Sequence, residues 1–205
     1  MMPAILTNRL WGTLLLVACT LLAACGDRAV KWTLYDVKGH LPDLNFQLSG
    51  AAGKTVSSDD LKGKTVMLFF GYASCPDICP TTMAQLSAVM DQLGDDARDV
   101  RIVFISVDPH RDTPDKLQAY VDAFNKQAIG ATGTEKQIAD LARRYRVAYQ
   151  IEKPRPGDSA DNYDITHSRG VYIFDNTGKA RLLASDSEST AAIVKDVRQL
   201  IEITG

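Results

Sequence analysis

The chain has 205 residues, enough for one sizeable domain, and its 45% hydrophobic and 23% charged residues are ordinary for a soluble protein. Lys and Arg total 23 against 25 Asp and Glu, which gives a formal net charge of −2, and the basic residues form no stripe. Nucleic-acid binding therefore has no electrostatic support.

The first residues resemble an export signal. Arg9 precedes an apolar stretch at 11–22, which has the length of a signal-peptide core and falls short of the roughly 20 residues that a membrane-spanning helix needs. The stretch ends in Leu22-Ala23-Ala24-Cys25-Gly26, which resembles a bacterial lipobox. This resemblance implies cleavage before Cys25, lipidation of that residue, and anchoring to a membrane of the bacterial cell envelope, facing the periplasm. An ordinary signal peptide, or a short anchor with an incidental Cys, is the alternative.

The chain is therefore divided into a signal peptide (1–24), a tether with little fixed structure (25–41) and one folded domain (42–205). Cleavage removes Arg9 and leaves 22 basic and 25 acidic residues, a net charge of 22 − 25 = −3. Cys19 is lost with the signal peptide and Cys25 carries lipid, so Cys75 and Cys79 are the remaining thiols. A single close pair is not the disulfide framework of a small secreted domain, and it favours working chemistry.

The predicted elements begin with a β-hairpin at 44–56. The near-continuous apolar run at 66–70 predicts a strand buried on both faces. Apolar residues at helical spacing follow at 80–93 and predict a helix, and residues 101–107 predict a second buried strand. Thr113 and Pro114 open the next helix, because a capping side chain and a proline in the first turn favour a helix start. The remaining predicted elements are a loop at 130–134, a helix at 138–145, a strand at 147–151, a long exposed loop at 153–164, a hairpin of strands at 171–174 and 180–184, and a helix from Ser189 or Thr190.

Two buried strands joined by a helix require a parallel crossover connection. Together with the closing hairpin and helix, this order predicts an α/β fold, a thioredoxin-like sandwich with a central mixed sheet, an N-terminal hairpin and flanking helices. The two cysteines then lie at the end of the first buried strand, where that architecture places its chemistry.

Cys75 and Cys79 stand where this strand turns into a helix. A dithiol oxidoreductase more usually has two residues between its cysteines, whereas the three present here leave room for an ion between the sulfurs and do not forbid a disulfide. The helix N-terminus is expected to favour the thiolate form, which binds soft metals and attacks disulfides. The pair therefore predicts a soft-metal site or a redox couple, with two inert buried cysteines as the alternative.

Three histidines are candidates for a further ligand. His40 lies in the predicted tether, His110 in the loop after the second buried strand, and His167 just before the strand at 171–174. Spacing alone does not decide between His110 and His167.

Three motifs occur in order along the chain. Residues 71–80 (GYASCPDICP), residues 106–114 (SVDPHRDTP) and His167-Ser168 ahead of residues 172–175 resemble the signatures of the Sco/SenC family of thioredoxin-fold copper proteins. The resemblance covers most of residues 44–204. The family usually has an Asp immediately before the His, whereas this chain has Thr166, so that Asp164 or no residue supplies that carboxylate.

The resemblance implies one copper ion held by Cys75, Cys79 and His167, since thiolates suit Cu(I) and an added imidazole suits Cu(II). It implies maturation of the dinuclear copper centre of cytochrome c oxidase, by copper delivery or by reduction of the target's cysteines, with Cys75 and Cys79 then acting as the redox couple. The implied partners are the copper-centre subunit of that oxidase and a periplasmic copper chaperone or thiol reductant. Asp77 and Asp108 are expected close behind the ligands; a solvated turn residue and a loop or cap residue are the alternatives.

Two other functions stay open. A thiol–disulfide oxidoreductase or thiol peroxidase of the cell envelope needs only the same two sulfurs on the same fold. A structural zinc site would need a fourth protein ligand, and the sequence offers no further cysteine outside the signal and lipid positions. The copper-binding protein would not be an enzyme in the usual sense.

Overall fold

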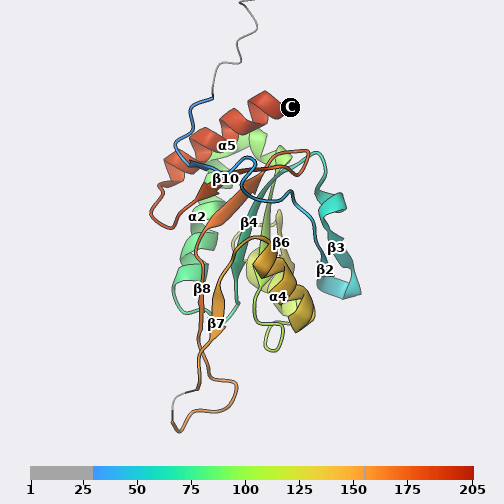
Figure 1. Cartoon of the computed structure of the whole chain (residues 1–205), viewed down its shortest axis with the longest axis vertical. Helices are drawn as coiled ribbons and strands as arrows, with labels where there is room; N and C mark the ends of the chain where they lie inside the picture. The colour runs from blue at the N-terminus through green and yellow to red at the C-terminus, as the bar shows by residue number, and fades with distance from the viewer. Residues whose placement is uncertain (1–29, 155) are drawn as a thin grey trace, which may run out of the picture. The chain divides into compact units, whose positions relative to one another are not determined.

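A six-stranded mixed sheet forms the centre of the folded part (Figure 1). The computed structural model describes residues 30–154 and 156–205, so the predicted signal peptide and Cys25 lie outside the described residues. The strands, in spatial order, are β1 (Tyr35–Asp36), β10 (Ala180–Ala184), β9 (Val171–Phe174), β4 (Thr65–Gly71), β5 (Val100–Ser106) and β6 (Ala128–Ala131).

The predicted buried strands form the middle of this sheet. Every residue of β4 is buried, and β4 pairs with β5 in parallel, with Phe69 opposite Phe104. The helix α2 (Ile78–Leu93) connects the two strands, as predicted. On its other side β4 pairs antiparallel with β9, which forms the predicted hairpin with β10. The mixed sheet of the predicted thioredoxin-like fold is therefore confirmed.

Helices cover both faces of the sheet. The described residues contain α2, α3 (Pro114–Asp122), α4 (Glu135–Arg144) and α5 (Thr190–Thr204). Tyr120 of α3 packs on Phe104, with ring centroids 5.4 Å apart, whereas Tyr145, just after α4, packs on Phe70 at 6.3 Å. Since Phe69 and Phe70 alternate along β4, these contacts lie on opposite faces. None of these helices combines the length and apolarity needed to cross a membrane.

Two small sheets flank the central one. The strands β2 (Gln47–Ser49) and β3 (Thr55–Ser57) form the predicted N-terminal hairpin, and β7 (Tyr149–Ile151) pairs antiparallel with β8 (Ile165–His167). Residues 152–164, which connect β7 and β8, hold no helix or strand in their described part and extend away from the sheet in Figure 1, as the predicted exposed loop. Short 3₁₀ turns complete the fold, namely η1 (Ala51–Gly53), η2 (Ser58–Leu61) and η3 (Gly94–Asp99).

The predicted tether is too long at its C-terminal end. Tyr35 and Asp36 form β1, and Leu34 is buried. The backbone N–H groups of Thr33 and Leu34 donate to the carboxylate of Asp196, a buried residue of α5, at 2.6 and 2.7 Å. Folded structure therefore begins before residue 42, because a side chain distant in sequence holds this segment.

Besides β1, two further short strands were not predicted. The predicted loop at 130–134 begins inside β6, where Gly130 allows close approach of α3, since a Cβ there would lie 2.8 Å from the Leu117 backbone. His167 lies shortly before β9, as expected, and it also ends the unpredicted strand β8. Strands of three or four residues are too short to show a clear apolar alternation, and their pairing is decided by tertiary packing.

Candidate metal centre

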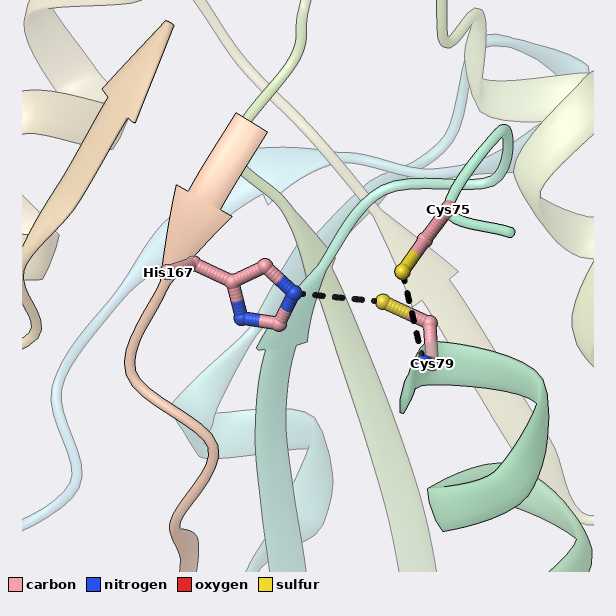
Figure 2. Close-up of side chains that lie close together, drawn as sticks. All are labelled: Cys75, Cys79 and His167. Atoms are coloured by element: carbon pink, nitrogen blue, oxygen red, sulfur yellow. Dashed lines mark hydrogen bonds between the residues drawn. The ribbon is translucent and has the colours of Figure 1, made fainter. Parts of the chain in front are cut away.

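The thiol pair lies where β4 leads into α2. Cys79 is fully buried in the first turn of α2, and Cys75 is half-buried in the preceding loop. Both thiols are free, and the Cys79 backbone N–H donates to Cys75 Sγ at 3.4 Å (Figure 2). The loop therefore holds the two sulfurs close together without a disulfide.

A glycine and a buried carboxylate allow this loop to pack against the central strands. A Cβ on Gly71, the last residue of β4, would lie 2.6 Å from Cys79 Sγ, so the thiol occupies space that only glycine leaves free. The buried carboxylate of Asp112 accepts hydrogen bonds from the Ala73 N–H at 2.8 Å and from the Ser106 hydroxyl at 2.7 Å. The thiol loop is thus attached to both central strands.

His167 reaches the thiols from β8. Figure 2 shows its ring directed at Cys79, with Nε2 3.4 Å from Sγ, and the ligand atoms of Cys75, Cys79 and His167 all lie within 4.8 Å of one another. Nδ1 lies 2.8 Å from the Ser168 carbonyl oxygen, which can only accept, so Nδ1 carries the proton and the Nε2 lone pair faces the sulfurs. The ring packs edge-on against Phe69 and Tyr72.

The other predicted residues lie outside this cluster. His110 is exposed and pairs with Asp161 at 3.2 Å. Of the two histidines that spacing left as candidate ligands, His167 is therefore the one that lies beside the thiols. Asp77 is exposed beside the site, and Asp108 is buried against Arg111. Among the described residues, neither Asp164 nor another carboxylate pairs with the imidazole, and the Ser168 carbonyl oxygen orients it instead. The sequence could not predict this contact, because every residue has a backbone carbonyl and no residue pattern marks the one that accepts from His167.

Burial controls the charge of the ligands. It raises the pKa of the Cys79 thiol, and the neighbouring Cys75 adds to this effect. The expectation that the helix N-terminus favours the thiolate is therefore wrong for Cys79, since desolvation of the anion outweighs the helix. Burial also lowers the pKa of His167, which keeps the imidazole neutral and its Nε2 available. In the metal-free form Cys79 and His167 are thus uncharged, and a bound metal would displace the proton of the Cys79 thiol.

The donor set fits a soft metal of low coordination number. Two sulfurs and one imidazole suit copper in either oxidation state, whereas structural zinc usually takes four protein ligands. Within residues 30–154 and 156–205 this is the one cluster of His, Cys and acidic ligand atoms that could hold a metal ion. A cavity of about 260 Å³ lies beside it, lined in part by Tyr72, Cys75, Asp77 and His167. The site is therefore accessible from one side.

This fold, with two thiols at a helix start and one imidazole opposite them, defines a thioredoxin-like protein with a thiol–imidazole metal centre. A model of the SCO1/SenC family matches residues 39–202, well over half of the chain. The chain belongs to the SCO1/SenC family, which confirms the resemblance drawn from its three motifs.

Relatives and solved structures agree with this assignment. The SCO2-like protein RC0895 of Rickettsia conorii is 38% identical over 135 residues, which cover 66% of this chain and 65% of the relative, so the chain spans slightly less than two thirds of that protein. Copper-bound ScoI of Bradyrhizobium japonicum is 33% identical with a TM-score of 0.69, over 78% of this chain and 99% of that one. Copper-bound ScoI of Arabidopsis thaliana is 34% identical with a TM-score of 0.69, over 77% and 98% of the two chains.

Proposed function

We propose that this chain is a membrane-tethered copper-binding protein that matures the dinuclear copper centre of cytochrome c oxidase. Proteins of this family bind copper and take part in cytochrome c oxidase assembly. The observation that carries the proposal is the meeting of Cys75, Cys79 and His167, with all ligand atoms within 4.8 Å of one another. Two similar proteins solved with copper bound support the same choice of metal.

The three ligands divide the work of holding copper. The sulfurs of Cys75 and Cys79 suffice for Cu(I), which accepts two soft ligands, and His167 Nε2 adds the harder donor that Cu(II) favours. The Ser168 carbonyl keeps the Nδ1 proton in place, so the imidazole needs no rearrangement to offer Nε2. Copper is the cargo of the protein, which the two thiols retain and the oxidase subunit receives.

Reduction of the oxidase's cysteines is the second candidate, and the geometry of the thiols favours it too. The Cys79 N–H lies 3.4 Å from Cys75 Sγ, so a disulfide between the two cysteines would close a short loop. Cys75 is the more exposed thiol and would attack the target disulfide, after which Cys79 would release the reduced target. Two electrons and two protons pass from the pair to the target in this exchange.

Copper titration of the reduced chain tests the proposal. The full chain in detergent, with Cys19→Ser and Cys25→Ser so that only two thiols remain, should take up one copper and show a sulfur-to-copper charge-transfer band in the Cu(II) form. His167→Ala should weaken Cu(II) binding far more than Cu(I) binding. Failure of the reduced chain to bind copper would overturn the proposal, while turnover of a disulfide by His167→Ala at the parent rate would favour the reductase.

Membrane tethering is the part of the proposal that rests on the lipobox-like residues around Cys25. Several acyl chains, at about 0.8 kcal/mol for each buried CH₂, would anchor the protein stably. Mass spectrometry of the protein from bacterial membranes should find an N-terminal peptide that begins with an acylated Cys25. An unmodified Cys25, or an N-terminus elsewhere, would contradict the anchor.

A further inference from the structure

Arg111 occupies a position between the two loops that meet at the site, although it touches none of the three ligands. Its Nε donates to the carboxylate of Asp108, and its Nη1 donates to the backbone oxygens of Tyr163 at 2.7 Å and of Asp161 at 3.1 Å. Its guanidinium carbon lies 3.6 Å from the centroid of the Tyr163 ring. Arg111 therefore joins the segment after β5 to the end of the long loop before β8.

The contacts around Arg111 form a closed ring. The Tyr163 hydroxyl donates to Asp108 Oδ1 at 2.8 Å, while Arg111 occupies the other carboxylate oxygen. The Asp108 side chain is 1% exposed and that of Arg111 is 13% exposed, so solvent screens the pair little. A planar guanidinium that forks to carboxylate and carbonyl oxygens and stacks on an aromatic face is a rigid link, which lysine cannot reproduce.

The closed ring of contacts among Arg111, Asp108 and Tyr163 restrains β8, the strand that carries His167. Tyr163 lies two residues before β8, and β8 pairs with β7 outside the central sheet. The Ile165 N–H donates to the Tyr72 hydroxyl at 3.3 Å, and the Arg111 guanidinium also lies 5.5 Å from the Tyr72 ring. Side-chain contacts with the segment after β5 and with Tyr72 therefore help to place His167 relative to the thiols.

We propose that Arg111 is a positioning residue of the site, which fixes His167 opposite the thiols through Asp108 and Tyr163. Nearby Asp112 performs the same task for the thiol loop through the Ala73 N–H. The segment from Ser106 to Asp112 thus holds both loops of the site in register. As far as it concerns copper, this inference rests on the proposed function, and its consequence is that Arg111 sets the preference for Cu(II) over Cu(I).

Two variants break the ring in different ways, and the chain offers a matched control. Arg111→Lys keeps the charge and removes the fork and the stacking, whereas Tyr163→Phe removes only the hydroxyl. Arg181→Lys is the control, because Arg181 pairs with Asp175 at 3.1 Å and the two side chains are 15% and 3% exposed. Asp175 follows β9, whose end pairs with the start of β4, away from the thiols.

The first measurement needs no metal. In the reduced metal-free full chain, the amides of residues 163–168 should exchange hydrogen about tenfold faster in Arg111→Lys, and by a smaller factor in Tyr163→Phe. Arg181→Lys should leave these amides unchanged. Unchanged exchange in both ring variants, or equal acceleration in the control, would overturn the positioning role, and the two ring variants keep the test decisive if one does not fold.

The second measurement uses copper itself. Arg111→Lys should lower Cu(II) affinity roughly 10–100-fold and shift the sulfur-to-copper band, as expected when a residue that orients a ligand is lost, while Cu(I) affinity stays unchanged. Equal losses for both oxidation states would overturn the inference. If the parent chain bound no copper, the proposed function would fail, while the exchange experiment would still decide whether Arg111 positions the histidine strand.

Discussion

The two halves of the candidate copper site are attached to the molecule in different ways. Cys79 is fully buried at the start of α2, where Gly71 leaves space for its sulfur, and Asp112 holds the preceding loop against the central strands. His167 is 9% exposed, on a two-stranded sheet outside the central one and beside a long polar loop. The thiols, which would bind both oxidation states, are thus attached to the central sheet. His167, which would distinguish the two states, is held from outside that sheet by side-chain contacts.

Removal of one thiol should have the largest effect. Cys75→Ser or Cys79→Ser replaces a soft sulfur by a hydroxyl of similar size that does not ionise near neutral pH, so Cu(I) binding should fall by several orders of magnitude. Competition with a Cu(I) chelator measures the loss, and circular dichroism shows whether the fold persists. A serine variant that held Cu(I) as tightly as the parent chain would show that the thiol half is not the anchor.

Adding a side-chain carbon at Gly71, next to the Cys79 sulfur, should have the next largest effect. In Gly71→Ala the new Cβ would lie 2.6 Å from Cys79 Sγ and 3.0 Å from the Phe104 ring. Overpacking of this kind costs about 1–3 kcal/mol, and displacement of the sulfur should weaken Cu(I) binding as well. Urea unfolding and chelator competition measure the two effects.

Gly133→Ala is the matched control for this change. Its Cβ would approach the side-chain ends of Leu48 and Gln137 at 2.9 and 3.0 Å, away from the thiols, so it should leave Cu(I) binding intact. Equal behaviour of the two alanine variants would contradict a specific role for Gly71.

The thiol half was predictable from the sequence because strong patterns specify it. The apolar run at 66–70 lies inside the fully buried β4, and the helical spacing at 80–93 lies inside α2. Such signals reflect burial, which is local to each element.

The histidine half was predictable only through the family resemblance. β8 spans three residues, and nothing in Ile165, Thr166 and His167 predicts its pairing with β7. Spacing left His110 and His167 equivalent, since the choice depends on which loop folds back over the thiols. The Ser168 carbonyl and the ring around Arg111 involve backbone atoms and contacts across about 50 residues, which have no sequence period.

A pH titration of stability should detect the buried imidazole with a smaller effect. Burial lowers the folded pKa of His167, so the unfolded chain takes up the proton first as the pH falls below about 6.5. Stability is therefore complete above that value and decreases as the pH falls through the folded pKa. Urea unfolding of the reduced metal-free chain at about pH 7.5 and about pH 5.5 should show this loss, and His167→Asn should show a smaller one. Equal losses in the two chains would mean that His167 does not contribute to the pH dependence.

The smallest expected effect comes from one hydroxyl that links the two halves. Tyr72 follows β4, its hydroxyl accepts the Ile165 N–H at 3.3 Å, and its ring packs edge-on against His167. Tyr72→Phe keeps the ring and removes the acceptor, so the free energy of unfolding should fall by about 0.5–1.5 kcal/mol, and the Ile165 amide should exchange faster. Cu(II) affinity should fall by less than about tenfold and Cu(I) affinity should not change, since the thiol loop keeps its own contacts.

Tyr145→Phe provides the comparison for Tyr72→Phe. The Tyr145 hydroxyl is also a buried link, since it accepts the Asn45 N–H at 2.9 Å and donates to the Asp43 carbonyl at 3.1 Å. Its loss should lower stability by a similar amount without affecting Cu(II). If Tyr72→Phe lowered Cu(I) affinity as much as Cu(II) affinity, the thiol and histidine halves would not be independent, and the division of the site into two separately held halves would be wrong.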